Sequence, residues 1–285
     1  MEIINLSLIV SHKYYRILKS LTRYLFLFIA FPLFQLSSGQ REGNTWIFGM
    51  NAGLNFNTFP PQPFDLPKFP YKIWDNWSLY NNQFHKGLST ISDSSGNLLY
   101  FAEGSQAWNK EFDFLQNGDS LLGPNFHPCL FVHSTNRDKI MIVQAYRDFS
   151  NIGKNSGAYY SLIDPSMDNS KGAITLKNVA IGDSLLAIFD AAATEKKDTI
   201  LFAFVKGGSD QIDYIETRPN GLQYLSSLKT GRYFKLGTVN TFEPTEYGQM
   251  KFSSNGKKLA VLTNLNKEIL IIDQSNGYSN SKIQS

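Results

Sequence analysis

The chain has 285 residues, of which 42% are hydrophobic and 18% are charged, and this composition excludes an intrinsically disordered chain. Residues 1–39 hold four of the 27 basic residues and one of the 24 acidic ones, so 23 of each sign remain from residue 40 onward. This neutral remainder has no run of Lys and Arg interleaved with aromatic residues, which argues against a nucleic-acid partner.

The first 39 residues have the order of a secretory signal. Four basic residues precede an apolar run at 24–36, and small residues at 37–39 offer a cleavage site before Gln40. An apolar run of about 13 residues is short for a membrane span. We therefore predict a signal peptide at 1–39, a mature domain at 40–285, and secretion or display at the cell surface. Contact with a membrane is expected only through an uncleaved leader.

The first strand is predicted at residues 45–49, followed by a turn at 51–53. In a closed ring of blades an N-terminal strand often completes the last blade. We expect this role for residues 46–48.

The segment 56–84 holds nine aromatic residues and five prolines in 29 positions. Repeated proline excludes a regular helix or a central strand, and so long a loop is usually functional or a covering flap. Aromatic side chains offer flat apolar faces that stack on ligands and anchor interfaces. The candidate binding residues are Tyr71, Trp74, Trp77 and Tyr80. The alternative is that they pack over the side of the domain and keep water off an edge.

One local pattern occurs four times from residue 87 onward. A strand-like run leads into a polar turn, and a more apolar run and a further strand-like segment follow. The turns lie at 92–97, 134–139, 194–198 and 253–258. The apolar runs lie at 98–101, 140–143, 200–205 and 259–262. Equivalent turns are roughly 40 to 60 residues apart, and this spacing predicts an all-β chain that forms a β-propeller of about four recognisable blades.

Two parts of this pattern leave alternatives open. Residues 183–193 have several apolar residues that would suit a short helix, but we interpret them as a loop that feeds a strand. After the strand-like segment 268–273, a turn and residues 278–285 remain, which leaves the last blade without a final strand. Either the N-terminal strand fills this gap, or the chain belongs to a larger ring that is incomplete here.

Most residues that could act in catalysis or ligand binding have an ordinary structural explanation. Asp93, Asp138 and Asp198 fall in the polar turns, where Asp side chains bond the local backbone. Cys129 is the single cysteine, so no intramolecular disulfide is possible, and we expect it to be a small buried residue.

Metal and catalytic patterns are weak. His127 and His133 share one face of a strand-like run but bring no further ligand with them. Glu243, Glu246 and Asp148 are candidate carboxylates of a glycosidase, whose required separation the sequence does not give. We predict no metal site, no cofactor and no catalytic residue.

Several runs resemble a known family. Residues 44–56, NTWIFGMNAGLNF, are similar to the N-W-Y-F-G-x-N-A-G-L-D-F opening of the N-terminal propeller in secreted bacteroidete surface proteins. Residues 89–101, STISDSSGNLLYF, resemble its A-T-I-S-D-x-x-G-N-L-L-F-Y stretch. Residues 107–110 and 117–123 resemble the positions that follow it. Residues 250–260, MKFSSNGKKLA, resemble the M-K-x-S-P-D-G-K-K-L-A signature that WD40-like propellers share.

This resemblance implies an exported WD40-like β-propeller of gliding or adhesin-type proteins, which often carry PKD repeats and a sorting signal for type IX secretion. The chain departs from the pattern in its longer aromatic segment and in having no PKD repeat after Ser285. The expected function is non-catalytic recognition or scaffolding at the cell surface, with a protein or glycan as partner. The alternatives are a propeller-type glycoside hydrolase or lyase, and a TolB-like envelope scaffold.

The aromatic segment yields the first testable prediction. Trp74→Ala combined with Trp77→Ala should weaken partner or glycan binding and leave thermal stability unchanged, because exposed aromatic faces would be lost without loss of core packing. Binding assays together with thermal melts measure both effects. A double mutant that melts several degrees lower and binds normally would make the segment structural.

Overall fold

The computed structural model describes residues 41–48, 52–65, 89–123, 129–146, 157–194, 198–219, 221–234, 248–263, 268–275, 277–278 and 282–284. The sheets described below all belong to one compact unit that begins at Glu42. The described residues are almost entirely β structure. Their helical segments are the single turns η1 (Arg41–Gly43) and α2 (Met167–Ser170), so no described helix is long and apolar enough to cross a membrane.

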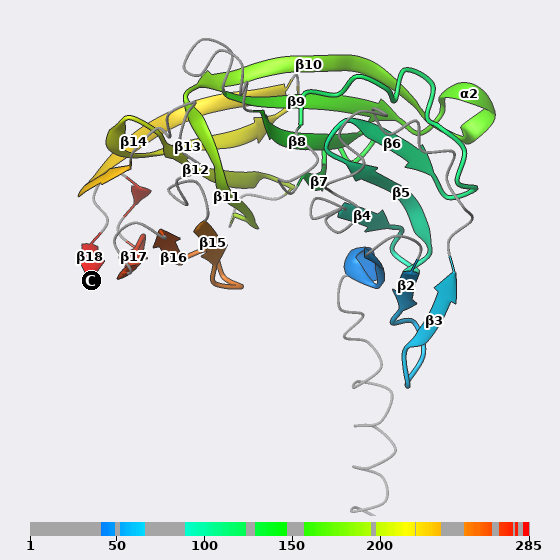
Figure 1. Ribbon diagram of the computed structural model, residues 1–285, viewed down its shortest axis with the longest axis horizontal. Helices are drawn as coiled ribbons and strands as arrows, with labels where there is room; N and C mark the ends of the chain where they lie inside the picture. Colours follow the sequence, from blue (N-terminus) through cyan, green and yellow to red (C-terminus); the bar gives the residue numbers. More distant parts are fainter. Residues whose placement is uncertain are drawn as a thin grey trace, which may run out of the picture. The chain divides into compact units, whose positions relative to one another are not determined.

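The described strands form five antiparallel sheets, and within each sheet the strands are hydrogen-bonded in sequence order (Figure 1). Sheet A is β1 (Thr45–Phe48), β2 (Ala52–Asn55) and β3 (Gln62–Asp65); sheet B is β4 (Ser89–Ser92), β5 (Leu98–Glu103) and β6 (Gln106–Asn109). Sheet C is β7 (Leu130–His133), β8 (Ile140–Tyr146), β9 (Gly157–Asp164) and β10 (Ala173–Asp183). Sheet D is β11 (Leu185–Ala193), β12 (Ile200–Lys206), β13 (Ser209–Arg218) and β14 (Gly221–Phe234). Sheet E is β15 (Gly248–Phe252), β16 (Lys258–Thr263), β17 (Glu268–Asp273) and β18 (Lys282–Gln284).

The repeated turns close in nearly the same way. The N–H of Ser134 bonds the carbonyl of Lys139 at 2.9 Å, and the N–H of Ser253 bonds the carbonyl of Lys258 at 2.9 Å. The Asp93 carboxylate accepts bonds from the N–H groups of Ser95 (2.8 Å) and Asn97 (2.9 Å). The predicted structural role of this turn aspartate is therefore confirmed.

Consecutive sheets pack face to face through four hydrophobic clusters. Ile47 of sheet A packs with Phe101 and Trp108 of sheet B. One cluster joins sheets B and C, the next joins C and D, and the largest joins D and E. The first strands also touch one another, β1 with β4, β4 with β7, and β11 with β15. The sheets therefore follow each other in chain order.

Strand β8 shows why these sheets need two neighbours. Ile140 and Ile142 belong to the cluster shared with sheet B, and Met141 and Val143 belong to the cluster shared with sheet D. Side chains alternate between the two faces of a strand, so both faces of β8 are buried. A strand buried on both faces has a continuous apolar run, which is the signal that the sequence gives at 140–143.

Buried polar groups connect neighbouring sheets. Gln144 of β8 donates from Nε2 to the carbonyl of Gly104 at 2.8 Å. Asp190 of β11 accepts a bond from the N–H of Phe252 in β15 at 2.8 Å, and the Lys251 ammonium lies 3.0 Å from the same carboxylate. These bonds satisfy polar atoms that lie between the sheets.

The all-β prediction is confirmed, but three expectations about elements are corrected. Residues 185–193 form strand β11 rather than a loop. The last sheet has its own fourth strand, β18, which pairs with β17. Strand β1 pairs with β2, where we expected it to complete the last sheet. Strand β3 contains Pro63 and lies at an edge of sheet A, which is where sheets tolerate proline.

The Asp190 contact yields a prediction. Asp190→Ala should lower the free energy of unfolding by about 1–3 kcal/mol, because the buried N–H of Phe252 loses its acceptor. Urea unfolding measures the change. Asp190→Asn keeps an acceptor and should lose less. Lys251→Ala is the matched control, since its side chain is 78% exposed and an exposed ion pair contributes roughly 0–1 kcal/mol. A Lys251 variant as unstable as Asp190→Ala would contradict this assignment.

Candidate functional site

Several residues singled out in the sequence lie outside the described residues. These are the aromatic candidates Tyr71, Trp74, Trp77 and Tyr80, together with His127, Asp148, Glu243 and Glu246. Their roles stay predictions. His133 lies on β7, and within the described ranges no group of three or more His, Cys, Asp and Glu is placed to hold a metal ion.

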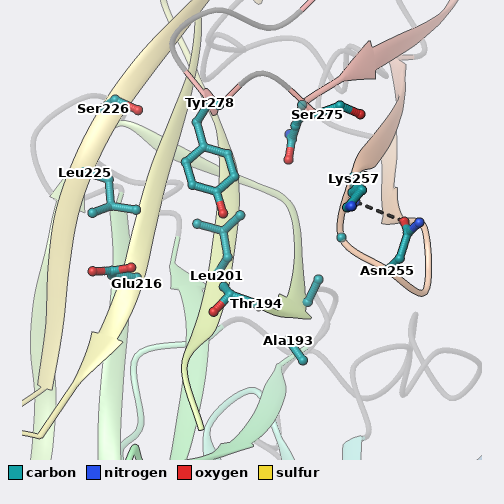
Figure 2. Close-up of a pocket in the computed structure, with 14 residues that line it drawn as sticks. Ala193, Thr194, Leu201, Glu216, Leu225, Ser226, Asn255, Lys257, Ser275 and Tyr278 are labelled. Carbon is teal, nitrogen blue, oxygen red and sulfur yellow. Dashed lines mark hydrogen bonds between the residues drawn. The ribbon is translucent and has the colours of Figure 1, made fainter. Parts of the chain in front are cut away.

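The candidate site is a cleft of about 530 Å³ between sheets D and E. Figure 2 shows Leu225, Ser226 and Glu216 on one side, with Leu201 and Tyr278 at the centre and Lys257 on the facing turn. The lining is completed by Ala192, Ala193, Thr194, Asn255, Gly256, Gln274, Ser275 and Gly277.

Local irregularities bring these residues together. The pairing of β13 with β14 shifts register between Tyr214 and Ile215, and this bulge lets both Leu225 and Ser226 line the cleft. On the facing side, the Asn255 Oδ1 accepts a bond from the N–H of Lys257 at 3.1 Å (Figure 2). Gly256 has a φ of +65°, and a Cβ there would lie 3.2 Å from the carbonyl of Ala193. The turn therefore approaches the end of β11 closely.

Buried polar groups form part of the cleft wall. Glu216 is 2% exposed and forms an ion pair with Arg218. Gln274 is 5% exposed and donates from Nε2 to the hydroxyl of Tyr214 at 2.6 Å. Among the described residues, the Gln274 Oε1 has no hydrogen-bond partner. An unpaired buried acceptor is costly, so this amide lowers the stability of the wall.

Two tyrosine rings support this wall. The rings of Tyr214 and Tyr278 stack with centroids 5.2 Å apart. Burial raises the pKa of the Tyr214 hydroxyl, so this group stays protonated at neutral pH. Tyr278 lines the cleft, where a tyrosine offers both a flat apolar face and a polar tip.

The lining as a whole suits binding of a polar molecule, and Lys257 adds one ammonium group at its edge. It combines the hydroxyls of Thr194, Ser226, Ser275 and Tyr278 with two side-chain amides and an apolar strip at Leu201 and Leu225. Glu216 is the one carboxylate among the lining residues. Ligand pockets commonly combine an apolar lining with a few placed polar groups of this kind.

Sequence reasoning singled out none of the buried polar residues of this cleft. A signal for Glu216 was present, because Ile212, Tyr214 and Glu216 alternate along one strand and the first two are core residues. An acidic residue in a buried row is unusual. Gln274 gave no comparable signal, since it is buried against a tyrosine 60 residues earlier.

Cys129 lies in the core between sheets B and C, as predicted. It is 2% exposed, and its thiol donates to the carbonyl of Ala102 at 3.6 Å. Burial raises the pKa of the thiol to about 12, so the reactive thiolate is scarce at neutral pH.

No family model and no curated protein matches the chain. Solved structures that are similar include a proposed 6-phosphogluconolactonase from Bacteroides uniformis, with a TM-score of 0.41 and 14% identity over 82% of this chain. The chain spans 64% of that structure. A functionally unknown protein from Desulfotomaculum acetoxidans has a TM-score of 0.39 and 8% identity, with 87% of this chain and 85% of that one covered.

The burial of Cys129 yields a prediction. The native chain should leave its thiol unreacted with Ellman's reagent at neutral pH, and the chain unfolded in guanidinium should react with one equivalent, because unfolding exposes the thiol and lowers its pKa. The absorbance of the released thiolate measures both states. Rapid reaction of the native chain would contradict the burial of Cys129.

Proposed function

We propose that the chain is an exported, non-catalytic β-propeller that acts as a recognition module at the cell surface. The sheet arrangement supports the propeller, because each sheet is an antiparallel meander and the first strands of several consecutive sheets touch. The structure describes five such sheets, whereas the sequence pattern indicated about four blades. The signal-like leader supports export.

A glycan is the partner that the cleft between sheets D and E supports best. The observation that carries this proposal is its lining, in which four hydroxyls accompany the Tyr278 ring and an apolar strip. Sugar rings present hydroxyl donors and acceptors around apolar C–H faces, so they complement both the polar groups and the apolar strip. Protein recognition through the aromatic segment 56–84 is the second route to the same function.

The enzymatic alternative is a propeller-type glycoside hydrolase or lyase. Hydrolysis of a glycosidic bond uses two carboxyl groups about 5 Å apart for retention or roughly 6.5–9.5 Å apart for inversion. Glu216 lies in the cleft and pairs with Arg218, so a second carboxylate would have to come from outside the cleft lining. The TolB-like envelope scaffold is the third alternative, and it requires an uncleaved leader.

A blocked cleft tests the proposal. Ala193 lies exposed at the end of β11 and lines the cleft, so Ala193→Trp should fill part of it. Glycan binding should weaken by about tenfold or more, which corresponds to a loss of about 1.4 kcal/mol. A printed array of cell-surface glycans identifies the bound glycan, and calorimetry measures its affinity. Ala180→Trp, at an exposed position of β10, is the matched control and should bind as the unsubstituted chain does.

Three outcomes would contradict parts of this proposal. Equal affinity in the Ala193 variant would exclude the cleft and favour the aromatic segment. An array without any bound glycan would leave protein recognition as the function. Release of shorter sugars from a bound glycan would make the chain an enzyme.

A further inference from the structure

Sheet E has an apolar outer face opposite to its contact with sheet D. Leu259 and Val261 of β16 pack toward sheet D, so Ala260 and Leu262 point the other way. Leu262 pairs directly with Ile269 of β17, and the two side chains are 41% and 56% exposed. Cross-strand apolar pairs of this kind are normally covered.

Sheet A has a corresponding outer face at the other end of the sheet series. Ile47 and Phe64 pack toward sheet B, so their neighbours Trp46 and Leu54 point away from it. Trp46 is 56% exposed, and its ring lies 4.8 Å from that of Phe56.

The internal interfaces show what such faces contact. At each internal interface, a sheet packs on the next sheet in chain order with one face, and that next sheet receives it with the face that points back toward the start of the series. Two of these receiving faces carry an aromatic pair, Phe101 with Trp108 in sheet B and Phe189 with Phe204 in sheet D. The pair of Trp46 and Phe56 gives the outer face of sheet A the same construction.

We propose that the outer face of sheet E docks the outer face of sheet A of a second copy of this chain. The contact continues the series of internal interfaces by one step, and it covers an exposed apolar face on each of these two described sheets. It joins two different surfaces, so it is a head-to-tail contact that gives either a closed ring of copies or an open chain of them.

Charges at the edges of the two faces agree with this pairing. Lys258 lies on the same outer side of sheet E as Ala260 and Leu262, and it is exposed. Asp65 pairs with Ala52 on the outer side of sheet A and is exposed. Opposite charges at the rim of an interface favour the correct partner orientation.

Sedimentation velocity of the purified chain over a range of concentrations tests the proposal. The unsubstituted chain should sediment with at least twice the mass of one chain. Ile269→Glu and Trp46→Glu each place a charge in the contact, so each should raise the dissociation constant by about tenfold or more. Leu176→Glu is the matched control, because Leu176 is 40% exposed on β10 of sheet C and should not alter assembly. Circular dichroism confirms that the variants fold.

Mixing the two variants decides the geometry. Ile269→Glu keeps an intact sheet A face and Trp46→Glu keeps an intact sheet E face, so their mixture should form a dimer although each alone is a monomer. A Trp46 variant that still dimerises alone would show pairing of two sheet E faces and overturn the proposal. An unsubstituted chain that stays monomeric at every concentration would also overturn it.

Discussion

The central strands of sheets B, C and D lie between two other sheets, and the rest of the fold depends on that double burial. In β12, Leu201, Ala203 and Val205 pack on sheet E, while Phe202 and Phe204 pack on sheet C. A strand in this position has no exposed face for a charged side chain. Each sheet therefore depends on its neighbours for stability, and polar groups between sheets need partners of their own. Asp190 meets that requirement by accepting the N–H of Phe252, and the Gln144 Nε2 meets it by donating to the carbonyl of Gly104.

The same constraint explains how much of the fold the sequence could predict. Continuous apolar runs marked β5, β8, β12 and β16, and the polar turns marked their starts. Strand β10 was missed because its pairing with β9 shifts register three times, which destroys the alternation that identifies a half-buried strand. Strand β11 was misread for a similar reason, since its register shifts between Leu185 and Phe189. Strand β18 has three residues and is too short to carry a pattern.

The cleft was less predictable than the fold, because its lining comes from segments that are far apart in the sequence. The bulge at Leu225 forms only when β13 and β14 pair, and Tyr278 reaches the ring of Tyr214 only in the folded chain. Gln274 occupies a position that looks like an ordinary residue after a strand. Its burial depends on a tyrosine of another sheet, and no local period records that contact. Glu216 is the exception, since it shares a face of β13 with the core residues Ile212 and Tyr214.

The turn at residues 253–258 divides two roles between its residues. Hydrogen bonds between the end residues Ser253 and Lys258 close it, and the Asn255 Oδ1 accepts further bonds from the Ser253 hydroxyl and the Lys257 N–H. Lys257 is exposed and lines the cleft. Mutation of Lys257 can therefore vary the rim of the cleft while the turn keeps its backbone hydrogen bonds. Under the proposed binding role, this position would let ligand preference diverge among descendants of one scaffold, and it is a natural place to graft a new specificity.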